Sequence, residues 1–425
     1  MTSEEKAGEE KAREEKAGEE KAGGFAAFRY RDYRLYWFSR FLSTIAMQMQ
    51  AVAVAWQVYA ISHDPFDLGL IGLSLFLPAI CLVLVTGQVA DRYNRKTIIQ
   101  ICLAADFLFA IGLCALAFTG AERTWPIFTL LVGIGFARAF ITPAGQAMMP
   151  NLVDKKDLAN AVAWQSSAWQ VASVGGPAVG GLVLALGADI TYAVSAALTA
   201  ISVVMTGLIA TREFKSERQP VTWSSVLGGL TYIRYKPVVL GAISLDLFAV
   251  VLGGCVALYP IFATDILGVG PQGLGLLRAA PAVGAVLCSL WLVRHPLRSH
   301  AGLVMFWSVA VFGAGTVAFG LSTWFPLSLL ALFAMGAADM VSVYVRQTLI
   351  QLATPDNMRG RVGAVSSVFV TTSNEFGDFR AGMVAGLIGT VPTVVLGGVA
   401  TLAVTAAWTR LFPDLRKVER LDRTL

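Results

Sequence analysis

The chain has 425 residues, of which 56% are hydrophobic and only 14% charged, with a net charge of +5. A soluble domain carries about a quarter charged residues, so this composition excludes a surface that faces water on all sides. The five cysteines all lie inside apolar segments, which argues against a secreted fold built on disulfides.

Residues 1–24 form a charged, low-complexity tail. Four near-identical copies of Glu-Glu-Lys-Ala-Gly fill residues 4–23. Ala, Glu and Lys favour helix, but the repeat offers no apolar face to bury. We therefore expect a solvated, partly helical tail on the cytoplasmic side of a membrane.

Twelve apolar segments of about 20 residues follow, each long enough to cross roughly 30 Å of hydrocarbon as a helix. Their expected limits are 35–60, 68–88, 97–119, 126–147, 158–186, 190–210, 238–264, 272–293, 301–321, 326–350, 362–388 and 391–411. They are continuously apolar, which excludes the alternating pattern of a membrane β-barrel. The first segment is itself long enough to span, so no cleavable signal peptide is expected.

A charged stretch divides these segments into two groups of six. It covers residues 211–237 and is the longest hydrophilic interruption in the chain. The sequence therefore predicts an all-α membrane protein with two pseudo-symmetric six-helix bundles. They cover residues 25–210 and 238–411, with 211–237 as a cytoplasmic linker and 412–425 as a second cytoplasmic tail.

Basic residues fall almost entirely on one side of this layout. If the amino terminus lies in the cytoplasm, the outer loops hold only Arg123. The inner loops collect Arg29, Arg31, Arg34, Arg92, Arg95, Lys96, Lys155, Lys156, Arg212, Lys215, Arg218, Arg234, Lys236, Arg294, Arg298, Arg359, Arg361, Arg410, Arg416, Lys417, Arg420 and Arg423. Positive residues stay on the cytoplasmic side, which favours an even number of spans with both termini inside.

The most specific motif lies between spans two and three. It reads Gly87-Gln-Val-Ala-Asp91-Arg92-Tyr-Asn-Arg95-Lys96 and resembles the cytoplasmic loop signature of the major facilitator superfamily, G-x-x-x-D-R-x-x-R-R/K. A small residue such as Gly87 lets helices approach closely, and Asp91 is suited to a charge-assisted bond. We expect a latch at an inner gate. The alternative is an ordinary basic loop with a turn.

A second motif lies in span five. The stretch Gly175-Gly176-Pro177-Ala-Val-Gly180-Gly181 resembles the G-P-x-x-G-G element of major-facilitator antiporters. Glycines allow close packing, and Pro177 weakens the local hydrogen-bond ladder and allows a bend. Generic close packing of Gly-rich membrane helices is the equally weighted alternative.

Ionisable residues inside membrane spans are costly and usually functional. Arg138, Asp246, Asp339 and Glu375 fall deep inside their spans. Asp378 follows Glu375 by three residues, so both share a helix face, and two carboxylates that close repel when both are charged. These five residues are candidates for proton coupling or for a central cavity; the alternative is fixed pairing with arginines.

Two further arginines, Arg40 and Arg346, lie close to the expected cytoplasmic ends of their spans. Long basic side chains there can extend to the membrane surface. A structural role is therefore expected for both.

Longer stretches resemble the branch of the superfamily that contains bacterial enterobactin exporters and macrolide-efflux pumps. These are 137–144, 158–163, 273–281, 354–362 and 373–379. The resemblance implies export of a bulky amphipathic molecule or siderophore, coupled to proton entry. We also expect a monomer in a bacterial inner membrane, without a cofactor. Arg380 departs from the pattern, because the branch often has an acid there.

Three hypotheses follow for the function. The first is a proton-coupled exporter working by alternating access, and the second is an importer or uniporter of a small nutrient. The third is a non-transporting sensor on the same scaffold. There is no phosphate-binding G-x-x-x-x-G-K-[ST] motif, no metal-ligand spacing and no nucleophile motif, so neither an enzyme nor a nucleic-acid-binding protein is expected.

Overall fold

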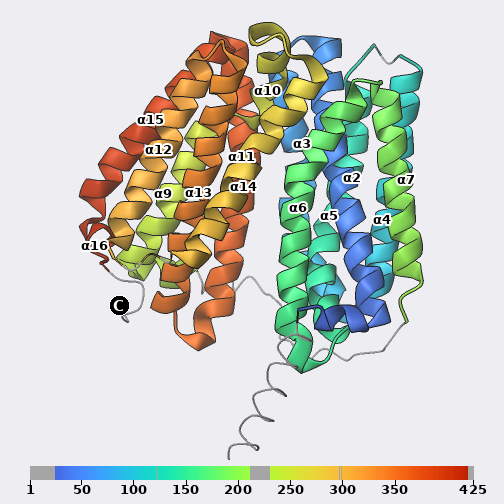
Figure 1. Cartoon of the computed structure of the whole chain (residues 1–425), viewed down its shortest axis with the longest axis horizontal. Coiled ribbons are helices and arrows are strands. Elements are labelled where there is room, and N and C mark those ends of the chain that lie inside the picture. Colours follow the sequence, from blue (N-terminus) through green and yellow to red (C-terminus); the bar gives the residue numbers. More distant parts are fainter. Residues whose placement is uncertain (1–23, 121, 211–229, 296, 298, 420–425) are drawn as a thin grey trace, which may run out of the picture.

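The computed structural model describes residues 24–120, 122–210, 230–295, 297 and 299–419, and within these ranges all regular elements are helices (Figure 1). The predicted tail 1–24, the linker 211–237 and the tail 412–425 lie mostly or partly outside the described residues. Some side chains of helices α3 (Pro65–Arg92) and α14 (Asp356–Ile388), including those of Asp91, Arg359 and Arg361, also lie outside the description.

The first six long helices match the first six predicted spans to within a few residues. They are α2 (Arg31–Ser62), α3 (Pro65–Arg92), α4 (Arg95–Phe118), α5 (Trp125–Met148), α6 (Leu158–Leu184) and α7 (Ala188–Gly207). Three short 3₁₀ turns flank them: η1 (Ala26–Arg29), η2 (Met149–Asn151) and η3 (Lys155–Asp157).

The second six spans are α9 to α15. They are α9 (Pro237–Gly253) with η4 (Val256–Leu258), α10 (Tyr259–Ile261) and η5 (Phe262–Ile266), then α11 (Gly270–Arg294), α12 (Ala301–Leu321), α13 (Phe325–Ala353), α14 (Asp356–Ile388) and α15 (Thr390–Leu411), followed by α16 (Pro413–Arg416). The predicted all-helical fold with twelve spans is confirmed.

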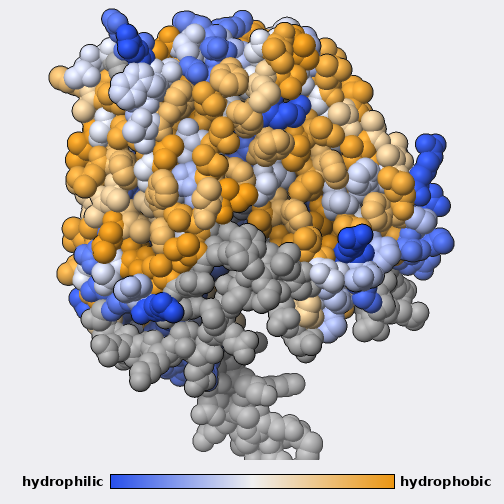
Figure 2. Space-filling model, turned by 180° about the vertical axis from the view of Figure 1, so that it is seen from behind, coloured by the Kyte–Doolittle hydropathy of each residue, from blue (hydrophilic) through white to orange (hydrophobic). Residues whose placement is uncertain are grey.

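Ten helical segments in the described part of the chain are long and apolar enough to cross a membrane by composition alone. Of the twelve spans, α6 and α14 do not meet that standard, because both carry many polar or small side chains. Hydrophobic residues dominate the middle of the face shown in Figure 2, with hydrophilic residues gathered toward its two edges. On this face the exposed apolar residues therefore form the band that lipid requires.

The helices pack in two groups that follow chain order (Figure 1). In the first group α2 packs against α6 and α7, while α5 packs against α3 and α4. In the second, α13 packs against α11 and α12, and α9 against α14 and α15. The two groups meet mainly where α6 packs on α11 and α3 packs on α14. Both of the spans that miss the standard of length and composition therefore pack against the other half.

The ends of the molecule differ in charge. We call the end that carries Arg31, Arg92, Lys155 and Arg294 the basic end, and the opposite end the far end. The contacts between the halves gather toward the far end. A Cβ added to Gly275 of α11 would lie 2.8 Å from the Cα of Gly181 of α6, and one added to Gly382 of α14 would lie 2.6 Å from the Cα of Gly69 of α3. Only glycine allows backbones this close.

One side-chain bond also joins the halves at the far end. The hydroxyl of Tyr59, near the end of α2, donates a hydrogen bond to the carboxylate of Asp265 in η5. Tyr59 is only 5% exposed, and the ring of His63 packs edge-on against it. The far end is therefore closed by backbone packing together with a buried polar contact.

The seventh span is broken, whereas the sequence predicts a continuous helix over 238–264. The α-helix stops at Gly253 and resumes as 3₁₀, α and π turns from Val256, because a Gly-Gly pair favours a break and Pro260 supplies no N–H. Two residues of α14 satisfy freed backbone groups: Asp378 accepts from the amide of Ala257 at 3.2 Å, and Arg380 donates to the carbonyl of Gly254 at 3.1 Å.

The segment before α2 is anchored at the basic end. Trp164 of α6 donates to the carbonyl of Gly24 at 2.8 Å, and its ring packs against Phe25 and Phe28. The hydroxyl of Tyr30 lies 2.8 Å from a carboxylate oxygen of Asp157, and this hydrogen bond raises the pKa of Tyr30 to about 12. Residues 24–30 therefore hold the loop that precedes α6.

Candidate functional site

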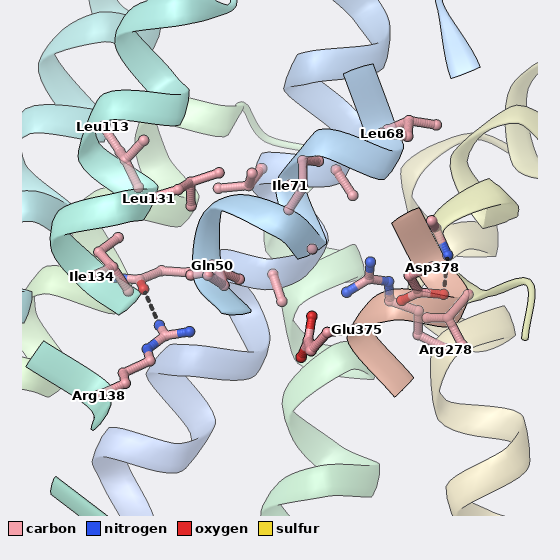
Figure 3. Close-up of a pocket in the computed structure, with 17 residues that line it drawn as sticks. Gln50, Leu68, Ile71, Leu113, Leu131, Ile134, Arg138, Arg278, Glu375 and Asp378 are labelled. Carbon is pink, nitrogen blue, oxygen red and sulfur yellow. Dashed lines mark hydrogen bonds between the residues drawn. The ribbon is translucent and has the colours of Figure 1, made fainter. Parts of the chain in front are cut away.

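A cavity of about 160 Å³ lies between the two halves (Figure 3). Its apolar wall comes mainly from α3, α4 and α5 and consists of Leu68, Ile71, Leu75, Leu113, Leu131 and Ile134. Its polar groups come from both halves and are Gln50, Arg138, Arg278, Glu375 and Asp378. A mainly apolar chamber with a few convergent polar groups is the usual form of a small-molecule site.

Arg138 of α5 is held on one side of this cavity. Its Nη2 donates to the side-chain oxygen of Gln50 at 3.0 Å, and its Nε lies 3.8 Å from Oδ1 of Asp106 on α4. Asp106 is only 4% exposed. The 3.8 Å separation is close to the upper limit for an ion pair. Arg138 is thus oriented by two partners, and it remains partly accessible from the cavity.

Arg278 of α11 and Asp378 of α14 approach each other on the opposite side (Figure 3). Asp378 is fixed by the Ala257 amide where the seventh span breaks. The Nε of Arg278 is buried and has no hydrogen-bond partner in the described part of the chain. Arg278 therefore brings an unsatisfied donor to the cavity wall, and such a buried donor is costly until a partner reaches it.

Glu375 lies between these two arginines in the close-up view (Figure 3). Its carboxylate faces α3 at Gly72, where an added Cβ would come within 3.4 Å of Oε2. Glu375 makes no ion pair within 4.0 Å to a described residue. The cavity therefore contains a carboxylate that lies between two guanidinium groups and forms an ion pair with neither.

Arg138, Glu375 and Asp378 thus meet at one cavity, while Asp246 and Asp339 lie elsewhere. Those two acids line a separate cavity of about 10 Å³ between α9, α12 and α13. Asp246 forms an ion pair with Arg346 of α13. The expectation that Arg346 reaches the membrane surface is wrong, because the residue is only 2% exposed.

The Gly-Pro element of α6 lies where three helices meet. A Cβ at Gly176 or Gly180 would crowd α2, at 2.6 Å from Cβ of Gln48 and 2.9 Å from Cα of Met49. A Cβ at Gly181 would lie 2.6 Å from Cα of Gly275 on α11. The carbonyl of Pro177 faces the same glycine of α11. The element therefore allows α6 to pack closely against both halves at once.

The loop motif is described only in part, because the side chain of Asp91 and the environment of Gly87 lie outside the description. Arg92 is exposed. Arg95 donates to the carbonyl of Ala147 at 3.1 Å, and Lys96 donates to that of Ile209 at 2.7 Å. Both acceptors are carbonyls just at or beyond helix ends, where cations are favourable.

Two polar cavity residues were not among the predicted site residues. Gln50 reads as one of several polar residues on α2, and nothing in its spacing marks it. Arg278 carries a signal that was available, since an arginine in the middle of an apolar span is costly unless it has a role. Only the fold places it opposite Arg138.

Comparison with known proteins gives the chain a context. The family described as transmembrane secretion effector, of the major facilitator type, matches residues 22–424. The chain is similar to the enterobactin exporter EntS of Shigella dysenteriae serotype 1, with 27% identity over 376 residues that cover 87% of this chain and 88% of that protein.

Solved structures share the fold at much lower sequence identity. A bacterial homologue of the human lysosomal transporter Spinster, in inward-facing and occupied form, has a TM-score of 0.72 at 15% identity, covering 91% of this chain and 98% of that one. Its inward-facing unoccupied form gives 0.70 at 16% identity, with the same coverage. These similarities support the twelve-helix fold alone.

Proposed function

Because this chain belongs to the transmembrane secretion effector family of major facilitator transporters, we propose that it exports an amphipathic small molecule, with siderophores as the first candidate cargo. Proton entry drives the export, and the cavity between the halves alternates between the two sides of the membrane. The siderophore assignment is supported by the similarity to an enterobactin exporter.

The central cavity is the observation that carries this proposal. Its apolar wall suits the hydrophobic part of a cargo, and its guanidinium and carboxylate groups suit polar substituents. Its volume of about 160 Å³ is below the ~300–1,000 Å³ of typical ligand pockets. A bulky cargo therefore requires the halves to move apart.

We place the basic end in the cytoplasm and the far end outside a bacterial inner membrane. The support is the concentration of arginine and lysine at one end. Since the close contacts between the halves gather at the far end, the structure then corresponds to a state whose outer side is closed. Cargo would enter such a state from the cytoplasm.

We assign proton coupling to Glu375, with Asp378 and Arg278 as its neighbours. Glu375 has no tight partner and faces the cavity, so a proton and a cargo group can both reach it. Asp378 is less suited because a backbone amide fixes its carboxylate. Arg138, oriented by Gln50, is the group that we expect to contact cargo from the first half.

The test uses everted membrane vesicles in which the protein pumps inward. Enterobactin accumulation reports transport, and cargo-dependent alkalinisation of the acidified vesicle lumen reports the protons that leave it in exchange. Wild-type vesicles should accumulate cargo when a proton gradient is present. Glu375→Gln should lose gradient-driven accumulation and keep cargo binding.

Glu122→Gln is the matched control, because Glu122 is an exposed loop acid that does not line the cavity. It should behave as wild type. Undiminished gradient-driven accumulation in Glu375→Gln would remove Glu375 from proton coupling, and absence of any gradient-dependent flux in the wild type would overturn the proposed function for this cargo.

A further inference from the structure

The small cavity between α9, α12 and α13 contains charge that the transport cavity does not use. Its walls include Asp246 from α9, Ser308 from α12, and Asp339 and Ser342 from α13. It shares no lining residue with the central cavity. Asp339, Ser342 and Arg346 follow at intervals of three and four residues, so they share one face of α13.

The charges of this cluster do not balance if every group is ionised. Arg346 is paired with Asp246, which neutralises both. Asp339 has neither an ion pair nor a hydrogen bond to any described residue. Asp339 is itself partly buried. A second carboxylate next to a neutral buried pair would be an uncompensated negative charge inside a membrane span, and such a charge is unfavourable.

A second observation points to a bound species at the same place. The hydroxyl of Ser342 is 2% exposed, lines the cavity and has no hydrogen-bond partner in the described part of the chain. Ser308, by contrast, donates to the carbonyl of Val304 at 2.8 Å. The cluster thus offers an unsatisfied hydroxyl beside an unpaired carboxylate.

We propose that Asp339 and Asp246 form a proton-binding site inside the second bundle, separate from the cargo cavity, in which Asp339 holds the proton and Arg346 neutralises Asp246. The proton makes the buried cluster electrically neutral. A protonated Asp339 also gains an O–H donor, which can serve the neighbouring carboxylate or the Ser342 hydroxyl.

A metal cation fits this cavity less well than a proton. Its volume of about 10 Å³ corresponds to a single water-sized sphere. Hard cations in proteins gather about six oxygen ligands, whereas this cluster offers two carboxylates and two hydroxyls. One of those carboxylates is already paired with Arg346, whose positive charge would repel a second cation.

Among the residues whose side chains are described, the surrounding helices supply no other charge to the cluster. Their described charged residues are Arg278 and Arg294 on α11, Glu375, Asp378 and Arg380 on α14, Arg410 on α15, and Asp414 and Arg416 on α16. No such residue lines the small cavity. The described residues of α12 include no charged side chain. Among described residues, Arg346 alone forms an ion pair with the cluster.

Infrared spectroscopy of the purified full-length protein in lipid, without cargo, tests the site. A protonated carboxyl group has a carbonyl band distinct from that of a carboxylate. We expect the wild type to show such a band at neutral pH, and Asp339→Asn to lose it. Glu375→Gln should keep it, which separates this site from the one assigned to cargo coupling.

Asp339→Asn replaces a neutral acid by a neutral amide of similar shape, so it should fold. Asp246→Asn is the second variant and should also lose the band, because Arg346, freed from Asp246, can then neutralise Asp339 as a carboxylate. An unchanged spectrum in Asp339→Asn would overturn the proposal, and so would a band that disappears on adding Na⁺ or K⁺, because that behaviour indicates a metal site. Neither result depends on whether enterobactin is the cargo.

Discussion

The buried ion pair of Arg346 with Asp246 gives the clearest expectation at the scale of single residues. Arg346→Met leaves Asp246 without its counter-charge in the bundle interior. Removing one partner of a buried pair costs about 3–5 kcal/mol. We therefore expect a large fall in the midpoint of thermal unfolding. Tryptophan fluorescence of the protein in detergent measures this midpoint.

The double variant Arg346→Met/Asp246→Asn provides the control, because it removes both charges together. It should regain most of the lost stability, since neutral replacements of a buried pair are often tolerated. A double variant as unstable as Arg346→Met would show that lost packing, and not the stranded charge, causes the effect.

Arg346 also shows why the depth of a side chain in the membrane does not follow from its distance to the end of the span alone. Its distance from the end of its span suggested a side chain that reaches water. Side chains on a helix point toward the helix amino terminus, however, and α13 ends at the basic end. The guanidinium is therefore directed back into the membrane interior, where the fold supplies Asp246. That partner is distant in the sequence and could not be read from it.

At the scale of helices, the contact between α6 and α11 depends on glycine. A Cβ at Gly181 would lie 2.6 Å from the Cα of Gly275, whereas one at Gly175 meets nothing within 4 Å. Overpacking costs about 1–3 kcal/mol. We therefore expect Gly181→Ala to lower the ratio of molecules closed at the far end to molecules open there by about 5- to 150-fold.

A single cysteine in place of Ile71, in an otherwise cysteine-free chain, reports this change, because Ile71 lines the central cavity. An impermeant thiol reagent applied at the far end should label it faster in Gly181→Ala. Gly175→Ala is the matched control on the same helix and should label at the reference rate, with stability equal to or slightly above it. Equal labelling of both variants would contradict a glycine-dependent closure.

The sequence pattern predicted which segments are spans, but it did not predict the break in the seventh span. The hydrophobic runs and the position of the basic residues gave the limits of α12 and α15 closely. The same reasoning treated span seven as one helix, because its break at Gly253 is stabilised by Asp378 and Arg380 of α14. A helix break that is satisfied by distant side chains leaves only a weak local signal, here a pair of glycines.

At the scale of the whole molecule, the charge asymmetry predicts the orientation in the membrane. Lys155 lies at the basic end and Arg123 at the far end, and both are exposed. In a cysteine-free chain, we expect Arg123→Cys to react with an impermeant maleimide in intact cells. Lys155→Cys should react only after the cells are permeabilised. The opposite pattern would place the basic end outside and reverse the direction proposed for transport.

Alternating access makes the two ends of the molecule move in opposite senses, and spin labels can follow both. Leu186 and Leu321 are exposed at the far end, one in each half, while Thr97 and Val293 are an exposed pair toward the basic end. Cargo together with an inward proton gradient should lengthen the far-end distance and shorten the basic-end distance, because rigid halves that rock about a central site cannot open at both ends. The close glycine contacts at the far end predict that the cargo-free protein starts with that end shut. Distances that change in the same sense, or remain fixed when cargo is added, would contradict the rocking of two rigid bundles around the cavity.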